Sequence, residues 1–177
     1  MTKVRRATLA DLEAIMEIQR ESYIPELVES RDVFAAIISA GLSHVAIAVT
    51  GEEVVGFALA HPSVRDRVHL LHTHVESFGE WDTLFIHDVS VRPSWRRKGV
   101  ASALVHRFTH PEFTHHPQVQ CIAMESAIPF WEKQGFRESE TVRLDAATLE
   151  SYGGGACAFM ESVSSTRGTR CPRRRPR

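Results

Sequence analysis

The sequence has few cysteines and lacks any long apolar run. Its three cysteines, Cys121, Cys157 and Cys171, are scattered and odd in number, so they predict no disulfide framework and favour a reducing compartment. No apolar run approaches the ~18 residues that a membrane-spanning helix needs, and the first residues hold no apolar signal-peptide region. We therefore expect a cytoplasmic protein with no membrane partner.

Several ligand-binding motifs are missing as well. The chain holds neither the G-x-x-x-x-G-K-[ST] loop of many nucleotide-binding proteins nor the G-x-G-x-x-G dinucleotide fingerprint. His69, His72 and His74 lack a second Cys/His group at zinc-site spacing, and His106 and His110 lack the glutamate of an H-E-x-x-H motif. We therefore expect no metal.

The net charge of −1 hides an uneven distribution of charge. Residues 164–177 hold six arginines and no acid, whereas the rest of the chain holds 15 of the 21 Lys and Arg residues and all 22 Asp and Glu residues. The acidic body has no basic face, so we expect no nucleic-acid partner for it. We interpret residues 1–163 as one domain and residues 164–177 as a disordered, solvated tail, for which binding to nucleic acid, an acidic partner or a transport receptor stays an alternative.

Apolar periodicity predicts a mixed α/β domain with helices on both faces of one sheet. A polar loop at 63–80 is expected to carry a short helix near 68–74 and to influence specificity. The predicted strands cover 4–7, 43–50, 53–61, 84–91, 119–124, 136–144 and 156–163, and the predicted helices cover 9–23, 30–40, 100–108 and 127–134.

The stretch from Leu84 to Leu104 is the most informative part of the chain. A β-rich run, residues 84–91, is followed by a Pro, a basic turn with Gly99 and then apolar residues at helical spacing. The first N–H groups of a helix have no internal partner and lie at the positive end of its dipole. This order predicts a phosphate cradle, and an ordinary β-turn-α connection is the alternative.

Two motifs in this order resemble the GNAT superfamily of acyl-CoA-dependent N-acyltransferases. RRKGVA at 96–101 fits the signature [Q/R]-x-x-G-x-[G/A], and the preceding IHDVSVRP at 86–93 is similar to a characteristic strand of that family. AIPFWEKQGF at 127–136 is similar to the family's A-x-x-F-Y-x-K-x-G-F. The resemblance covers residues 4–163, and it is nearest to arylalkylamine (serotonin-type) N-acetyltransferases and related polyamine acetyltransferases.

The resemblance implies a sheet of about six to seven strands and about four helices, in which strands 84–91 and 119–124 splay apart. It implies acetyl-CoA as cosubstrate and no metal. Backbone groups of Val89 and Val91 would bind the pantetheine arm, and the turn would bind the pyrophosphate. The implied acetyl-CoA site comprises Val89, Ser90, Val91, Arg96, Arg97, Lys98, Gly99, Val100, Ala101, Ser102 and Trp131.

The same resemblance assigns the proton transfers. His87 occupies the position of one of two histidines implicated as bases in the serotonin-type enzymes, and Phe85 stands at the other position. An imidazole titrates near neutral pH, so His87 is the predicted general base. Trp131 replaces the usual Tyr acid, and an indole N–H cannot serve as an acid near neutral pH. Ser126 or water would then protonate the thiolate.

Asp88 is expected to point to the opposite strand face from His87 and to make a structural hydrogen bond, unless a bulge re-aims it. The predicted partner is a small primary amine, and the predicted assembly is a monomer or homodimer. A catalytically inactive acyl-CoA-binding module of the same fold is the alternative function.

Two sets of residues could form the acceptor site. The aromatic set, which would otherwise be core, is Phe34, Phe57, Phe78, Trp81 and Phe85. The acidic set, which would attract a cation or otherwise be solvated, is Glu26, Glu29, Glu76, Glu80 and Asp82.

Overall fold

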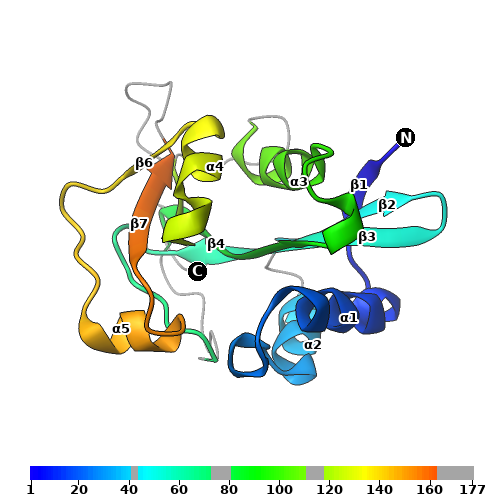
Figure 1. Cartoon of the computed structure of the whole chain (residues 1–177), viewed down its shortest axis with the longest axis horizontal. Coiled ribbons are helices and arrows are strands. Elements are labelled where there is room, and N and C mark those ends of the chain that lie inside the picture. The colour runs from blue at the N-terminus through cyan, green and yellow to red at the C-terminus, as the bar shows by residue number, and fades with distance from the viewer. Residues whose placement is uncertain (41–43, 73–80, 111–117, 163–177) are drawn as a thin grey trace, which may run out of the picture.

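A computed structural model describes residues 1–40, 44–72, 81–110 and 118–162, which form one seven-stranded sheet (Figure 1). The strand order across the sheet is β1-β2-β3-β4-β5-β7-β6. All neighbours are antiparallel except β4 and β5, which run parallel. The strands are β1 (Lys3–Arg6), β2 (His44–Thr50), β3 (Glu53–Ser63), β4 (Thr83–Val91), β5 (Val119–Met124), β6 (Phe136–Glu138) and β7 (Cys157–Ser162).

Helices cover both faces of the sheet, as the sequence predicted. Figure 1 shows α1 (Leu12–Ser22) and α2 (Arg31–Ala40) on one face, with α3 (Val100–Thr109) and α4 (Ile128–Lys133) on the other. A fifth helix, α5 (Ala146–Ser151), precedes β7. No helix in the described parts of the chain is long and apolar enough to cross a bilayer.

Each face of the sheet has its own apolar core. On the α1/α2 face, Phe34 and Phe57 are fully buried and meet edge to face at a centroid distance of 5.5 Å. On the other face, Leu104 and Phe108 of α3 pack on β3 and β4. Full burial of one such side chain contributes roughly 1.5–3 kcal/mol to folding.

Local signals explain where the first helical segment begins. Thr8 and Asp11 form a capping box, in which the Thr8 backbone N–H donates to Asp11 Oδ2 at 2.7 Å. Arg5 Nη2 lies 2.7 Å from Asp11 Oδ1, and the hydrogen bond from Arg5 lowers the pKa of Asp11 to about 2. The predicted helix at 9–23 is thereby confirmed as a single 3₁₀ turn followed by α1.

Three predictions of local structure were wrong. The strand expected at 136–144 ends at Glu138, because the Ser139 hydroxyl accepts the backbone N–H groups of Thr141 and Val142 and folds the chain into a turn. The helix α5 was missed, although the Asp145 side chain caps it by accepting from the Thr148 N–H at 2.8 Å. Residues 68–72 form no helix, and residues 73–74 lie outside the described part.

The parallel strands β4 and β5 separate along their length. Their pairing covers only Leu84 with Val119, Phe85 with Gln120 and Ile86 with Cys121. Beyond Ile86, β4 continues on β3, while β5 continues on β7. The two strands therefore splay at their carboxyl ends, as the resemblance implied. Beyond Ile86 and Cys121, the facing edges of β4 and β5 do not pair.

Candidate active site

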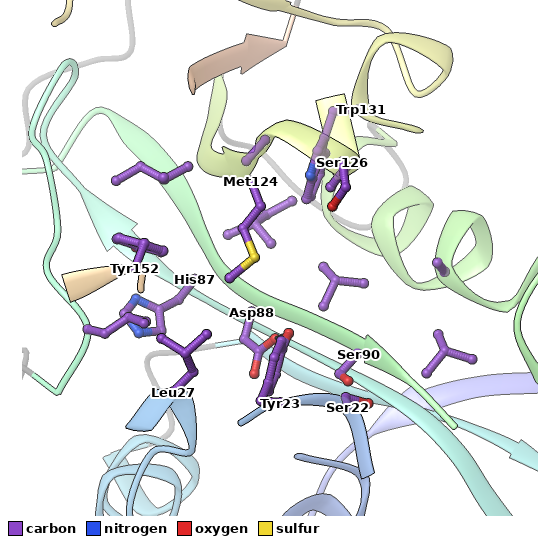
Figure 2. Close-up of a pocket in the computed structure, with 18 of the residues that line it drawn as sticks. Ser22, Tyr23, Leu27, His87, Asp88, Ser90, Met124, Ser126, Trp131 and Tyr152 are labelled. Carbon is purple, nitrogen blue, oxygen red and sulfur yellow. Dashed lines mark hydrogen bonds between the residues drawn. The ribbon is translucent and has the colours of Figure 1, made fainter. Parts of the chain in front are cut away.

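A pocket of about 330 Å³ occupies the splay between β4 and β5 (Figure 2). Its walls come from the end of α1, the segment before α2, β4, the start of α3, β5, α4 and the residue after α5. Predicted site residues that line it are His87, Val89, Ser90, Val91, Arg96, Ala101, Ser126 and Trp131, and those that do not are Arg97, Lys98, Gly99, Val100 and Ser102.

The edge of β4 inside the splay presents backbone groups to the pocket. Arg92 N–H donates to Val55 O of β3 at 3.0 Å. Because backbone polar groups alternate between the two edges of a strand, those of Val89 and Val91 are directed away from β3 and into the splay. The Val91 carbonyl already accepts from Arg96 Nε at 3.2 Å, so the turn is tied to this edge.

The turn before α3 has an open backbone at Gly99, where an added Cβ would meet nothing within 4 Å. Gly99 has φ +80° and Arg97 has φ +61°, and both belong to the left-handed region, which favours glycine at position 99. Lys98 Nζ lies 4.7 Å from the Trp95 ring centroid. Helix α3 starts at Val100, so its first N–H groups face the exposed side of this turn and suit an anion.

A bulge in β4 brings two titratable side chains to one face of the sheet. Leu59 of β3 pairs with Asp88, but the next residue, Ala60, pairs with Ile86, so His87 is the extra residue. Leu59 belongs to the core under α1 and α2, whereas Ala60 belongs to the core under α3. Asp88 is therefore on the α1/α2 face, and not on the face that a regular strand would have given it.

Asp88 and Tyr23 point toward each other in the middle of the pocket (Figure 2). Tyr23 follows α1, and its hydroxyl donates to Asp88 Oδ1 at 2.6 Å. Burial raises the pKa of Asp88 to about 7, although the Tyr23 hydrogen bond opposes this rise. Arg92 ion-pairs with Glu17 at 3.0 Å and with Glu21, which fixes the end of α1 beside β4.

His87 is held in a buried ion pair with Glu29. Its Nε2 lies 3.0 Å from Glu29 Oε1, and the two side chains are only 5% and 2% exposed. Burial alone lowers the pKa of His87, but the hydrogen bond and charge of Glu29 outweigh it, so the pKa is raised. The backbone N–H of His72 also donates to Glu29 Oε1 at 3.0 Å, which anchors the loop after β3.

Two further histidines lie behind His87. The His61 ring is 5.8 Å from that of His87 and 4.6 Å from that of His69, and it stacks on Phe85. Burial lowers the pKa of His61 to about 4 and that of His69 to about 3. The Ser63 hydroxyl lies 2.7 Å from His69 Nε2. Both histidines are therefore neutral at pH 7, and the His61 ring lies next to that of His87.

The opposite wall of the pocket is apolar. Trp131 is 6% exposed and packs edge to face on Phe136 at 4.9 Å, and Met124 and Ser126 extend from the end of β5 and the turn before α4 (Figure 2). This wall holds Trp131 where the resemblance implied an acidic hydroxyl. Among the described residues that line this wall, Ser126 carries the hydroxyl group.

Most of the aromatic and acidic residues singled out in the sequence lie elsewhere. Phe34, Phe57 and Phe85 are fully buried core residues, and Trp81 is 48% exposed. Of the acids, Glu29 lines the pocket, whereas Glu26 and Asp82 do not. Glu76, Phe78 and Glu80 lie outside the described residues. Leu27, Leu71 and Tyr152 line the pocket instead, and Figure 2 shows Leu27 and Tyr152 next to His87.

Sequence patterns did not single out Tyr23, Tyr152 or Met124 as site residues, and they gave Asp88 a structural role. Contacts across 65 residues join Tyr23 to Asp88, and contacts across 58 residues join Glu29 to His87. The one usable signal was an acid directly after a histidine in a β-rich run. Within the described ranges, no group of three or more His, Cys, Asp or Glu side chains is placed to hold a metal ion.

A sheet that splays beside a helix N-terminus defines a cleft for an extended, phosphate-bearing ligand. A sequence model of the acetyltransferase (GNAT) family matches residues 12–136. The chain therefore belongs to the GNAT family of acetyltransferases. No curated protein sequence matches the chain.

Solved structures share this fold over nearly their whole length. The ribosomal-protein-S18-alanine N-acetyltransferase of Escherichia coli is 18% identical with a TM-score of 0.68, and the match covers 95% of this chain and 97% of that one. The PaiA N-acetyltransferase of Thermoplasma acidophilum, solved with coenzyme A, is 14% identical with a TM-score of 0.66, covering 92% and 98%. The loading GNATL domain of CurA from Lyngbya majuscula is 10% identical with a TM-score of 0.73, covering 93% and 98%.

Proposed function

We propose that this chain transfers an acetyl group directly from acetyl-CoA to the primary amine of a small molecule, an arylalkylamine or a polyamine. The observation that carries the proposal is the pocket in the splay. It joins the β4 edge at Val89 and Val91, which is not paired with β5, to a cluster of titratable side chains at His87 and Asp88.

The residues of the cleft fit acetyl-CoA. In our proposal the pyrophosphate binds the first N–H groups of α3, where Arg96, Arg97 and Lys98 add positive charge. The pantetheine arm bonds the free edge of β4, and the Val89 N–H donates to the acetyl carbonyl oxygen. That donor would stabilise the oxyanion of the tetrahedral adduct, a contribution of about 3 kcal/mol when such donors are removed from other enzymes.

The acceptor must lose a proton before it attacks, because an alkylammonium has a pKa near ~10. Two side chains in the pocket are candidates for the base, His87 and Asp88. The acceptor end, with Tyr152, Leu71 and the buried Glu29, suits an amine that carries an apolar or aromatic body.

A thiol-release assay with acetyl-CoA tests the proposal. We expect turnover with at least one of tryptamine, phenethylamine and spermidine, and the preferred amine separates the arylalkylamine class from the polyamine class. CoA binding without turnover of any of the three amines would contradict the proposal. That result would favour the alternative function, an acyl-CoA-binding module, which the tryptophan at position 131 motivates.

A further inference from the structure

We propose that Asp88 and Tyr23 form a proton relay that serves both ends of the transfer, with Asp88 accepting the proton of the ammonium and Tyr23 delivering a proton to the CoA thiolate. This inference rests on the proposed function. It replaces the expected acid on α4 with a hydroxyl from the opposite wall, at the end of α1.

The first argument is geometric. The Tyr23 hydroxyl oxygen and Asp88 Oδ1 are 2.6 Å apart, and both residues line the pocket in the splay. A hydrogen bond from the Val89 N–H lowers the pKa of Asp88. The Asp88 carboxyl therefore occupies the donor that, in our proposal, the acetyl carbonyl oxygen takes over when acetyl-CoA binds. The base and the hydroxyl therefore flank the reacting centre.

The second argument is the state of the competing base. His87 Nε2 is occupied by Glu29, and His87 Nδ1 is buried with no partner among the described residues. Glu29 raises the pKa of His87 and so favours its protonated form, which cannot accept a further proton. We assign His87 and Glu29 to positioning, because this pair holds β4 and the His72 loop together beside Asp88.

The third argument is the missing acid. Trp131 carries only an indole N–H, which is a donor but no acid near neutral pH. Two phenols, those of Tyr23 and Tyr152, line the pocket. The Tyr152 hydroxyl donates to the backbone carbonyl of His69 at 3.1 Å. Tyr23 is therefore the phenol that contacts a titratable partner at the centre of the pocket.

The protons and electrons balance through the relay. Asp88 takes one proton from the ammonium, and the free amine forms the C–N bond while the carbonyl π electrons move to oxygen. The electron pair on oxygen then re-forms the C=O bond while the C–S bond breaks and its electron pair leaves on sulfur. Because burial raises the pKa of Tyr23 well above its usual range, Tyr23 gives its proton to that sulfur in one step with the transfer of a proton from the protonated Asp88 to the Tyr23 oxygen. Asp88 is then ionised again and takes the second proton from nitrogen, which it releases to water.

Other charged groups around Asp88 set the pH at which it accepts a proton. Burial raises its pKa to about 7, Tyr23 and His87 lower it, and Glu29 raises it. The charge of Arg96, in the turn before α3, lowers the pKa of Tyr23. The charge of Asp88 raises the pKa of Tyr152, so these two side chains also interact. The walls from β5 and α4 contribute Met124 and Trp131, which carry no charge.

The pH profile of kcat/KM with the preferred amine tests the relay. We expect kcat/KM of the wild-type chain to rise with pH as Asp88 ionises. The midpoint of this rising limb of the profile should lie near pH 7, the pKa of Asp88. Asp88→Asn should remove this limb and lower kcat by about 100-fold or more, the usual effect of losing a general base. Asp88→Glu should retain a limb and part of the rate. His87→Gln should keep the limb but move its midpoint to higher pH, because the charge of His87 lowers the pKa of Asp88.

Tyr23→Phe has two readouts: the position of the limb reports the hydrogen bond between Tyr23 and Asp88, and the fall in kcat reports Tyr23 as the acid. Without the Tyr23 hydrogen bond the pKa of Asp88 rises, so the limb should shift to higher pH and kcat should fall by about 10-fold or more. Tyr152→Phe removes a hydroxyl from the same pocket and should leave the midpoint of the limb in place. Coenzyme A affinity and thermal melting of each variant check that the fold is intact.

The outcomes separate the two proposals. Wild-type turnover with a limb that persists in Asp88→Asn and disappears in His87→Gln would overturn the relay and leave the proposed function standing. A Tyr23→Phe enzyme with an unchanged limb and rate would also overturn it. If the wild-type chain turned over no amine, the proposed function and the relay would fail together.

Discussion

At the scale of single residues, the site concentrates its charge in buried groups. Glu29, His87 and Asp88 lie within one pocket wall, and the neutral His61 and His69 pack behind them. Removing one partner of a buried ion pair is strongly destabilising, because the other charge stays buried without a partner. Loss of either Glu29 or His87 would have this effect. The electrostatics of this wall therefore couple the chemistry of the site to the stability of the fold.

His61 offers a direct measurement of that coupling. Its side chain is fully buried, and burial lowers its pKa from 6.5 in the unfolded chain to about 4. The folded chain therefore binds fewer protons than the unfolded chain below pH 6.5. The stability linked to His61 is complete above pH 6.5 and is lost, at about 1.4 kcal/mol per pH unit, as the pH falls toward 4.

We expect His61→Phe to remove this loss, because a phenyl ring can keep the stacking on Phe85 and cannot be protonated. Urea unfolding at pH 7.5 and at pH 5.5 measures the effect. The free energy of unfolding of the wild-type chain should fall relative to that of the variant by roughly 1 kcal/mol between these pH values. A difference between the two chains that stays constant with pH would contradict the prediction.

At the scale of elements, the contact between β3, β4 and α3 sets the geometry of the proposed CoA site. Gly56 lies at this contact, where an added Cβ would meet Ser90 O at 3.0 Å, Val100 Cγ1 at 3.2 Å and Val91 Cγ2 at 3.2 Å. The backbone of Ser90 cannot move aside without shifting β4. The absence of a side chain at position 56 therefore allows α3 to begin directly against the splayed edge.

Gly56→Ala should consequently weaken acetyl-CoA binding and destabilise the fold by about 1–3 kcal/mol, the usual cost of overpacking. Gly155→Ala is the matched control, because an added Cβ there meets nothing within 4 Å and its φ is not positive. Isothermal titration with acetyl-CoA and urea unfolding measure the two effects. Equal behaviour of the two variants would remove Gly56 from this role.

The elements that could be read from the sequence are those with a strong local signal. The strand-turn-helix at 84–108 was predicted because β-branched residues, a Pro, a Gly and helical apolar spacing follow one another there. The strand at 136–144 was overextended because the hydrogen bonds of Ser139 that end it have no periodic signature. The α5 helix was missed because six residues give too short a pattern for periodicity.

The site was harder to predict than the fold for a physical reason. Alternation along a strand places His87 and Asp88 on opposite faces, and only the pairing of Leu59 and Ala60 with β4 reveals the bulge that reverses this. Tyr23 looked like the last residue of a helix, and its contact with Asp88 spans 65 residues of sequence. Such contacts are set by packing between elements, so no local pattern carries them.

At the scale of the whole molecule, the sheet divides into two halves that meet at the splay. Strands β1 to β4 are covered by α1, α2 and α3, whereas β5, β7 and β6 are covered mainly by α4. Strand β7 lies between β5 and β6, so the last described strand is an interior part of the sheet. A C-terminal truncation that removes part of β7, which ends at Ser162, would therefore damage the half that carries Met124 and Trp131.

Residues 164–177 lie outside the described residues, and we predict that they are dispensable for folding and for acetyl-CoA binding. Deleting them should change the free energy of unfolding by less than about 0.5 kcal/mol, as for changes outside a packed core. It should remove six arginines and so abolish any salt-sensitive binding to DNA, which fluorescence anisotropy at 50 and at about 200 mM salt measures. A truncated chain that melts earlier or loses acetyl-CoA affinity would place the domain boundary after residue 163, whereas DNA binding that survives the deletion would move the nucleic-acid surface onto the acidic body.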